Sequence, residues 1–373
     1  MKKVLFTSHT ANFCKFNRPF MRWFREQGWQ VDYACACEEE VYDYDNLYTI
    51  SFARVPWSKD NIKAYKDLKK ILDENYYDII HTHTPMGSVI TRLAARNTRK
   101  KGTKVIYTAH GLHFFKGAPL KNWLMYYPME KWMSKYTDCL VLINEEDYQN
   151  CIKRHFKAGK IEKIEKIDGV GVDLNRFECL QPEQKKQCRK ELGISEKDFV
   201  LVCVAEFIPR KNHAFILDNM KKIHKEIPDA KLLLLGQGEL MSEYQVDVKR
   251  KGMQEYVTFL GYRSDVNKIC ALSDVLVSAS YQEGLPMNMI EAMAVGIPVV
   301  CSDIRGQRDL IKDGKNGYLF QLGDSERYCN RLVELYNNPE LREAIKENNL
   351  RDVKKYSIDN AIGAMEKIYR RYM

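Results

Sequence analysis

The sequence has no long hydrophobic run, although 45% of its 373 residues are hydrophobic. No apolar stretch approaches the roughly 18 residues that a helix needs to cross a bilayer. The first residues, Met1–His9, contain only a three-residue apolar run. That run is too short for a signal peptide and predicts a first β-strand instead. We therefore expect a cytoplasmic protein.

Cysteine pairs with the spacing of metal ligands are also missing. The eleven cysteines are scattered, with no Cys-x-x-Cys among them, and several lie inside apolar runs. An odd number of scattered thiols does not suit a disulfide framework or a zinc site, so we expect buried free cysteines. No Gly-x-Gly-x-x-Gly follows the first expected strand, which argues against the dinucleotide site of a Rossmann dehydrogenase.

The sequence has instead a regular alternation of short apolar runs with helical patterns. This order predicts parallel sheets whose strands are joined by right-handed crossover helices. Two such series in a chain of 373 residues predict an α/β protein with two Rossmann-like domains. We expect the domains at residues 1–168 and 177–355, with a C-terminal helix at 356–373 that packs back on the first domain. The expected strands are Lys3–Thr7, Gln30–Ala34, Asp78–His81, Lys104–Thr108, Asp138–Ile143, Phe199–Val204, Lys231–Leu235, Val257–Leu260, Asp274–Val277 and Pro298–Cys301.

The stretch Glu283–Glu291 places two carboxylates around the expected start of a helix. It contains Gly284 and Pro286 and stands between two runs typical of buried strands. A strand, a glycine loop and the amino end of a helix present free backbone N–H groups to an anion. Carboxylates do not bind phosphate, but they accept hydrogen bonds from sugar hydroxyls. A phosphate site with hydroxyl acceptors on either side suggests a nucleotide sugar.

Other polar residues come directly after expected strands, where ligands bind in open parallel sheets. Arg210 and Lys211 stand at what we expect to be a helix start, where cations oppose the helix dipole unless an anion is bound. Two cations there would neutralise a diphosphate and stabilise a departing nucleotide. His110 follows another strand end, in the domain that we expect to face Glu283 across a cleft.

Three histidines follow or end expected strands and raise the question of a metal site. They are His81, His83 and His110. No Asp or Glu lies close to them in the same loops, and we expect His81 and His83 to point to opposite faces of the extended chain. A metal site needs convergent ligands, so we expect none here.

These motifs together resemble those of the retaining glycosyltransferases of family 4, the group 1 glycosyl transferases, which have the GT-B fold. The capsule and exopolysaccharide branch of bacterial sugar transferases is the most similar. The matching pieces occur in the family's order and cover the chain from near its start to about residue 320. They are Thr108–Phe115, Gly169–Phe177, Arg210–Asn212, Gln282–Asn288 and Arg305–Phe320.

The resemblance implies a role for each matching position. Glu283 would contact the hydroxyls of the donor sugar, and Glu291 would hold the ribose hydroxyls. The loop that follows Glu283 would meet the diphosphate through its backbone amides, together with Lys211 and Arg210. His110 would lie by the reacting face of the donor sugar. The residues of that loop are Gly284, Leu285, Pro286, Met287 and Asn288.

The resemblance also implies the reaction. A hexose or N-acetylhexosamine would move, with retained anomeric configuration, from a nucleotide sugar to a lipid-linked or saccharide acceptor in surface polysaccharide synthesis. UDP is the family's usual carrier. Neither a metal nor another cofactor is expected, because protein cations and a helix dipole stabilise the departing diphosphate. A nucleotide-sugar epimerase of the same fold is the alternative.

Two departures from the family's pattern stand out. Glu206 occupies a position where many members have an arginine, so the diphosphate would rest on Lys211 and the neighbouring Arg210. The loop after the first strand, His9–Lys15, lacks the glycines that many members have there. Close approach of this backbone to a phosphate is therefore not expected.

Residues 95–137 carry nearly the whole positive surplus of the chain. They hold nine Lys or Arg and one acid, Glu130, in a protein of net charge +9. Aromatic residues and lysines alternate with apolar residues in the second half of this segment, which suits a membrane interface. We expect peripheral docking on the anionic inner face of the cell membrane, where a polyprenyl-diphosphate-linked sugar would be the acceptor.

Two alternatives compete with docking on a membrane. The aromatic side chains of the segment could belong to the core instead. They are Trp123, Tyr126, Tyr127 and Trp132. A nucleic-acid-binding protein could use the same lysines, because phosphate binding by lysine is not selective for lipid. The sequence contains no recognised nucleic-acid module, and the motifs described above would be left unexplained, so we expect no nucleic-acid partner.

Overall fold

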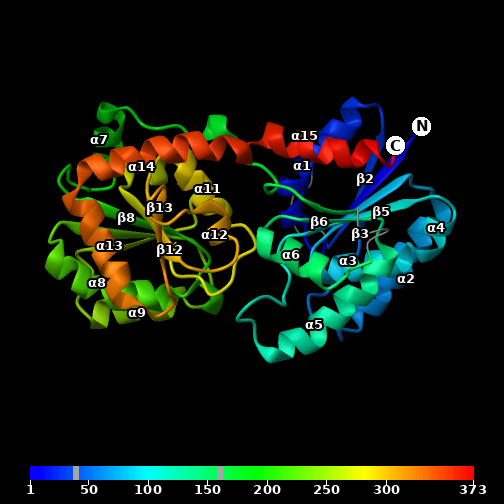
Figure 1. Ribbon diagram of the computed structural model, residues 1–373, viewed down its shortest axis with the longest axis horizontal. Helices are drawn as coiled ribbons and strands as arrows, with labels where there is room; N and C mark the ends of the chain where they lie inside the picture. Colours follow the sequence, from blue (N-terminus) through cyan, green and yellow to red (C-terminus); the bar gives the residue numbers. More distant parts are fainter. Residues whose placement is uncertain (37–41, 158–162) are drawn as a thin grey trace. The chain divides into compact units, whose positions relative to one another are not determined.

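The computed structural model describes residues 1–36, 42–157 and 163–373, and these residues form two compact units. Unit 1 contains Met1–Gly171 together with Ile358–Met373, and unit 2 contains Val172–Ser357. Each unit is built on one parallel sheet with helices on both of its faces (Figure 1). The predicted α/β class with two Rossmann-like sheets is confirmed.

Unit 1 has a seven-stranded sheet in the order β3-β2-β1-β4-β5-β6-β7. Its inner strands are almost wholly buried because both faces of the sheet are covered, so their sequences are apolar runs rather than alternating patterns. The strands are β1 (Lys3–Thr7), β2 (Gln30–Cys35), β3 (Asn46–Thr49), β4 (Ile79–His83), β5 (Lys104–Ala109), β6 (Cys139–Leu142) and β7 (Ile164–Lys166). The helices are α1 (Cys14–Glu26), α2 (Asp60–Glu74), α3 (Pro85–Ala94), α4 (Arg96–Lys100), α5 (Leu120–Met133), α6 (Glu145–Lys153) and α15 (Ile358–Arg370).

Unit 2 repeats this plan with a six-stranded sheet in the order β10-β9-β8-β11-β12-β13. One large apolar cluster fills the space between this sheet and its helices. The strands are β8 (Phe199–Val204), β9 (Ala230–Leu235), β10 (Val257–Gly261), β11 (Val275–Ser278), β12 (Val299–Ser302) and β13 (Gly317–Phe320). The helices are α7 (Pro182–Glu191), α8 (His213–Glu226), α9 (Met241–Arg250), α10 (Val266–Leu272), α11 (Met287–Ala294), α12 (Gln307–Leu310), α13 (Ser325–Asn337) and α14 (Pro339–Asp352).

In both units the strand order reverses at one place in the sheet. The reversal lies between β1 and β4 in unit 1 and between β8 and β11 in unit 2. The crossover connections on the two sides of such a point run in opposite directions, which opens a crevice at the carboxyl ends of the two strands. This topology decides where a ligand site is to be sought in each unit.

The C-terminal helix α15 is built into the core of unit 1. Its Tyr369 is buried, stacks on Trp23 and packs against Phe24 of α1. The Tyr369 hydroxyl also forms a hydrogen bond of 2.7 Å with Nδ1 of His81 on β4. Helix α15 therefore packs in the same core as α1 and β4, although it lies at the other end of the sequence.

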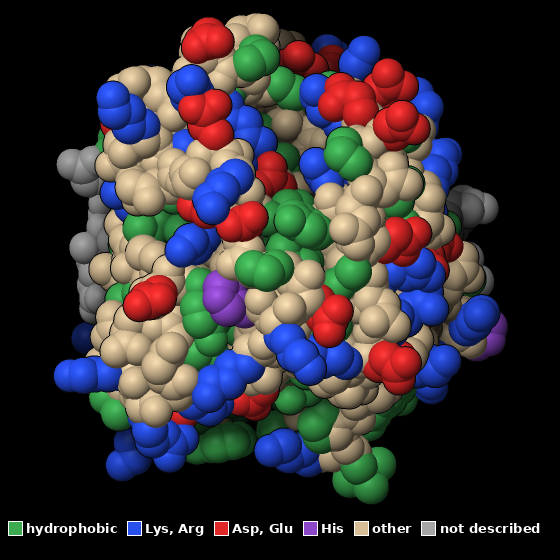
Figure 2. Space-filling view, turned by 90° about the vertical axis from the view of Figure 1, so that its left-hand side faces the viewer, with side chains coloured by type: hydrophobic (Ala, Val, Ile, Leu, Met, Phe, Trp, Pro, Cys, Tyr) green, Lys and Arg blue, Asp and Glu red, His purple; other side chains and the backbone are tan. Residues whose placement is uncertain are grey.

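Two general features of the described residues bear on the expectations from sequence. The ten cysteines among them are free thiols, eight of them buried, while Cys37 lies outside the described residues. Every helix in the described ranges is too short or too polar to cross a membrane. The side of the molecule shown in Figure 2, which is the left-hand side of Figure 1 with α8, α9 and α13, has Lys and Arg side chains interspersed with Asp and Glu.

Candidate active site

The loops that follow β8 and β11 lie side by side at the reversal point of unit 2. Lys211, from the first loop, donates a hydrogen bond of 2.6 Å from Nζ to Oε1 of Glu283, from the second. The other carboxylate oxygen of Glu283 lies 3.6 Å from Nη1 of Arg210. A carboxylate and two cations therefore converge where open α/β sheets bind their ligands.

Burial separates the two cations. The side chains of Lys211 and Glu283 are 13% and 9% exposed, whereas that of Arg210 is 45% exposed. Desolvation of an ion pair costs free energy that its Coulomb attraction only partly returns. Such a pair at the end of a sheet is therefore better suited to ligand binding than to stabilising the fold.

The local backbone around Lys211 differs from the prediction. Arg210 and Lys211 do not start the helix α8. They lie in a short 3₁₀ helix, Pro209–Lys211, and Asn212 follows it with a φ of 53°. Asparagine tolerates this left-handed conformation, and its side-chain amide donates to the carbonyl of Ala279 at 3.1 Å. The turn thus aims Lys211 at the end of β11 rather than along α8.

The amino end of α11 follows Glu283 by four residues. Pro286 stands at its N-cap position and has no side-chain group that can accept from the first-turn N–H groups. Asn288 donates from its amide to the carbonyl of Val204 at 2.9 Å, which holds the start of α11 against the end of β8. A helix start of this kind offers backbone N–H groups to an anion.

Reasoning from the sequence missed Arg305 as a component of this site. It follows β12, is 3% exposed, and donates from Nε to the backbone carbonyl of Glu283 at 3.0 Å. The next residue, Gly306, has a φ of 78°, and a Cβ there would come within 2.2 Å of the Gly284 carbonyl oxygen. The loop after β12 therefore packs directly on the loop that precedes α11. An arginine just past a strand end, inside a segment that matched the family pattern, was the available signal.

The structure brings most of the predicted residues together in unit 2. Glu283, the loop Gly284–Asn288 and Glu291 form one continuous loop and helix, with Arg210 and Lys211 against the loop. Glu291 lies about one turn into α11 and is partly exposed. His110 belongs to unit 1 and is described there.

Unit 1 has a cluster of histidines beside its own reversal point. His83 ends β4, and its Nδ1 lies 3.0 Å from Nε2 of His110, which follows β5. His81 forms hydrogen bonds through both ring nitrogens, with the hydroxyls of Thr108 at 2.8 Å and of Tyr369 at 2.7 Å. The His81 and His83 ring centroids are 4.2 Å apart, so the prediction that they point to opposite faces was wrong. Residues two apart on a strand share a face.

Burial determines the charge of these histidines. It lowers the pKa of His81 to about 3 and that of His110 to about 4, and it lowers the pKa of His83 well below its usual value. All three rings are therefore neutral at neutral pH. In the described ranges no group of three or more His, Cys, Asp or Glu side chains has the geometry to hold a metal ion.

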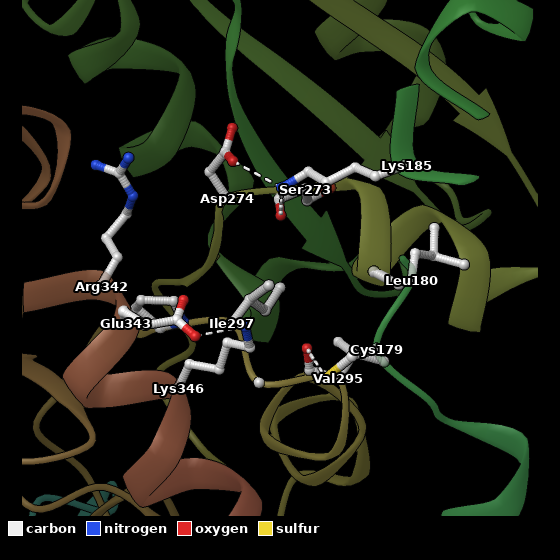
Figure 3. A pocket seen from close by; sticks show the side chains of 13 residues that line it. Cys179, Leu180, Lys185, Ser273, Asp274, Val295, Ile297, Arg342, Glu343 and Lys346 are labelled. Atoms are coloured by element: carbon white, nitrogen blue, oxygen red, sulfur yellow. Dashed lines mark hydrogen bonds and ion pairs between the residues drawn. The ribbon is translucent and has the colours of Figure 1, made fainter. Parts of the chain in front are cut away.

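A separate cavity of about 160 Å³ lies in unit 2 at the end of the strands opposite to the candidate site (Figure 3). Its wall includes Asp274 and Pro298, which come just before β11 and β12, so it opens at the amino ends of these strands. Two of its cations are paired with acids: Lys185 lies 3.0 Å from Asp274, and Lys346 lies 2.6 Å from Glu343. A third, Arg342, donates to the backbone carbonyls of Leu335 and Tyr336. None of these residues belongs to the predicted donor site, which lies at the carboxyl ends of the strands.

Comparison with known proteins gives matches over both units. The model of the family described as glycosyl transferases group 1 matches residues 184–352, and the model described as glycosyl transferase 4-like matches residues 3–144. The chain is 39% identical over 373 residues to a putative glycosyltransferase EpsD of Bacillus subtilis (strain 168), with 100% of this chain and 97% of the relative covered.

Two further matches extend this comparison. The chain is 31% identical over 356 residues to a UDP-Gal:alpha-D-GlcNAc-diphosphoundecaprenol alpha-1,3-galactosyltransferase of Escherichia coli, with 91% and 89% of the two chains covered. Among solved structures, HepE of Anabaena in complex with UDP and glucose superposes with a TM-score of 0.80 at 18% identity, over 100% of both chains. At this identity the superposition supports the fold alone.

Proposed function

The chain belongs to the glycosyl transferases group 1 family and is a glycosyltransferase with the GT-B fold, and we propose its reaction from that premise. The enzyme would move a hexose or N-acetylhexosamine from a UDP-linked donor to a lipid-linked saccharide during synthesis of a surface polysaccharide. The observation that carries the proposal is the pair of Lys211 and Glu283 at the ends of β8 and β11, with the amino end of α11 beside it. This arrangement combines positive charge for a diphosphate with an acceptor for hydroxyl groups.

The donor would be held by groups of opposite character. Lys211 and the first-turn N–H groups of α11 bind the diphosphate, and Glu291 accepts hydrogen bonds from the ribose hydroxyls. Glu283 accepts from hydroxyls of the donor sugar. Because Lys211 and Glu283 lie only 2.6 Å apart, a diphosphate must share Lys211 with this carboxylate. Arg210 lies close enough to Glu283 to neutralise it in part. Many family members have an arginine for the diphosphate at the position of Glu206, and Arg210 would make that contact here.

The same groups would promote departure of the nucleotide. As the bond from the sugar to the phosphate breaks, negative charge grows on the diphosphate, and Lys211 is positioned to stabilise it. We propose retention by attack on the same face, in which the leaving phosphate oxygen takes the proton of the acceptor hydroxyl. Neutral His110 would lie at the reacting face of the sugar. The cations and the α11 amino end supply positive charge without a metal ion.

The relatives support the choice of donor and acceptor. The name of the Escherichia coli relative states a UDP-linked galactose donor and a diphosphoundecaprenol-linked acceptor. The Anabaena structure was solved with UDP and glucose. A capsular polysaccharide biosynthesis glycosyltransferase, CapM of Staphylococcus aureus, is 24% identical over 370 residues, which supports the link to a surface polysaccharide.

Helix α5 supports docking at a membrane surface. Leu120, Leu124 and Trp132 lie at intervals of four or eight residues along it and are 73%, 70% and 46% exposed. By contrast, Trp123, Tyr126 and Tyr127 are partly buried against the apolar cluster around Phe114, so they belong to the fold. The apolar stripe available to a membrane therefore consists of Leu120, Leu124 and Trp132 rather than of all the aromatic residues.

The charges of residues 95–137 fit the same interpretation. Their one acid, Glu130, is 5% exposed and forms a buried ion pair of 2.8 Å with Arg92. The exposed charges that the segment itself contributes are therefore all positive. A depression lined by Arg96, Lys100, Lys135 and Tyr136 adjoins the stripe, since the ring of Tyr136 contacts that of Trp132 at a centroid distance of 5.5 Å. We propose that this surface docks on the anionic inner face of the cell membrane.

Two linked assays test the proposed activity. Thermal unfolding with UDP-glucose, UDP-galactose, UDP-N-acetylglucosamine and UDP-N-acetylgalactosamine should show stabilisation by at least one, with ADP-glucose and GDP-mannose as controls. Transfer from that donor to a synthetic polyprenyl-diphosphate N-acetylglucosamine should then give a product whose anomeric configuration, read by NMR, matches the donor's. Absence of stabilisation by all four UDP-sugars, or inversion in the product, would refute the proposal.

A further inference from the structure

His83 is held rigidly at the end of β4. It is 0% exposed, and its ring stacks parallel to that of Phe6 at a centroid distance of 6.3 Å. The chain turns immediately after it through Thr84, whose φ of 65° is strained for a β-branched residue. The Thr84 hydroxyl stabilises this turn by accepting from the backbone N–H of His9 at 3.1 Å. Strain that the surrounding structure maintains is typical of functional sites.

The two ring nitrogens of His83 have different surroundings. Nδ1 lies 3.0 Å from Nε2 of His110, whereas Nε2 is buried and has no hydrogen-bond partner among the described residues. A neutral imidazole carries one proton. On Nε2 that proton would be a buried donor without an acceptor, which folded proteins rarely contain. On Nδ1 it is donated to His110.

We propose that His83 is a positioning residue that donates its Nδ1–H to Nε2 of His110 and so holds His110 in the tautomer protonated on Nδ1. The ring of Phe13 meets that of His110 edge-on at a centroid distance of 4.9 Å, so two side chains restrain its orientation. The inference rests on the proposed function in one respect, namely that His110 lies by the donor sugar.

This tautomer limits what His110 can do. Its Nε2 is occupied as an acceptor, and its Nδ1–H is a hydrogen-bond donor. His110 would therefore donate to an oxygen of the bound sugar nucleotide rather than act as a base through Nε2. Its lowered pKa, about 4, agrees with a ring that stays neutral through the reaction.

Long-range ¹H–¹⁵N NMR on protein with ¹⁵N-labelled histidine reads the tautomer directly. The His110 signals, assigned by their loss in His110→Gln, should show protonation on Nδ1 in the unaltered protein. His83→Phe keeps a ring against Phe6 but removes the donor, and it should shift His110 toward a mixture of tautomers. Tyr369→Phe is the matched control, because it removes a hydrogen bond to His81 and leaves the His83–His110 contact intact. His110 protonated on Nε2, or unchanged by His83→Phe, would overturn the proposal.

Kinetics with whichever UDP-sugar stabilises the protein against thermal unfolding supply the second measurement. His83→Phe should lower kcat by up to about 100-fold while changing KM much less, because the misplaced group acts in the transition state. His83→Asn, whose amide can donate from near the Nδ1 position, should restore most of the loss. Equal kcat losses in the Phe and Asn variants would contradict a positioning role. Since the tautomer is read without any sugar nucleotide, failure of this inference is distinguishable from failure of the proposed function.

Discussion

Lys211 and Glu283 stand 72 residues apart in the chain, and each neutralises the other where both are largely shielded from water. Removal of one partner leaves the other charge desolvated and unpaired. Substitutions here therefore act on stability as well as on activity, and the two effects need separate measurements. Arg210 offers the comparison within the site, because it approaches the same carboxylate from a more exposed position.

Lys211→Ala should lower kcat by roughly 100-fold or more, since one preorganised charge facing a leaving group contributes on that order. Donor affinity, measured by calorimetry with UDP, should fall less than kcat. Arg210→Ala is the control and should have a smaller effect on kcat. Equal losses of affinity and turnover in Lys211→Ala would assign Lys211 to simple donor binding.

Glu291→Ala should weaken the binding of UDP, because the ribose hydroxyls lose an ionised acceptor that contributes roughly 1.5–3 kcal/mol. UMP should lose as much affinity as UDP, since both nucleotides carry the same ribose. Glu283→Ala is the comparison, because this carboxylate is assigned to the donor sugar and its loss should spare UMP. Calorimetry that finds unchanged UMP affinity in Glu291→Ala would reject the ribose role.

At the scale of elements, the apolar runs allowed all ten expected strands to be placed within two residues of their observed ends. The three strands that the sequence did not reveal, β3, β7 and β13, are all at edges of the sheets. They are three or four residues long. β3 and β7 are incompletely buried, so their short mixed patterns gave no signal. β13 is mostly buried, but its four residues begin with a glycine and follow a glycine-containing turn, so they were not recognised as a strand.

The candidate site shows a second limit of the sequence. Placing Arg210, Lys211 and Glu283 after strand ends required only local patterns. Their contact depends on β8 lying next to β11, and strand order follows from the packing of the whole unit. The same holds for Arg305, whose bond to the Glu283 carbonyl requires β12 beside β11. Residue types at strand ends were predictable, whereas their pairing was not.

The stripe on α5 gives a prediction at this scale. The double substitution of Leu120 and Leu124 by Ser should weaken binding to vesicles of anionic phospholipid, measured by sedimentation, by at least about tenfold. Each leucine contributes up to about 1.5–3 kcal/mol when fully inserted, and a loss of about 1.4 kcal/mol, which is less than one fully inserted leucine, already lowers affinity tenfold. Both side chains are largely exposed, so the thermal stability should not change. Val246→Ser is the matched control, since Val246 is an exposed apolar residue on α9 in unit 2.

The positive charges of the same surface should act in parallel. Neutralising four exposed lysines should weaken vesicle binding by about 1 kcal/mol for each lysine, and the loss should disappear on neutral vesicles. These residues are Lys100, Lys101, Lys116 and Lys121. Arg99 is not a useful target, because it is held by a two-point hydrogen bond to Asp138. Unchanged binding to anionic vesicles in both variants would contradict docking through residues 95–137.

At the scale of the whole molecule, the two units differ in their content of buried neutral histidines. Burial lowers the pKa of His9, His81, His83 and His110 in unit 1, and in unit 2 it lowers that of His213 to about 4. In the unfolded chain each histidine titrates near 6.5. The two units should therefore respond differently to mild acid.

The sign follows from proton linkage. Between pH 6.5 and about 4 the unfolded chain binds protons that the folded histidines do not, so the free energy of unfolding decreases as the pH falls through this window. Each such histidine contributes a slope of up to about 1.4 kcal/mol per pH unit, and above pH 6.5 the effect vanishes.

Hydrogen exchange at pH 7.5 and pH 5, read peptide by peptide and corrected for intrinsic rates, should show a larger loss of protection in unit 1 than in unit 2. His110→Gln should lower by about one the number of protons that unit 1 takes up on unfolding, so its free energy of unfolding should depend less steeply on pH. Equal losses in the two units would show that the histidine cluster does not set the acid stability of the protein.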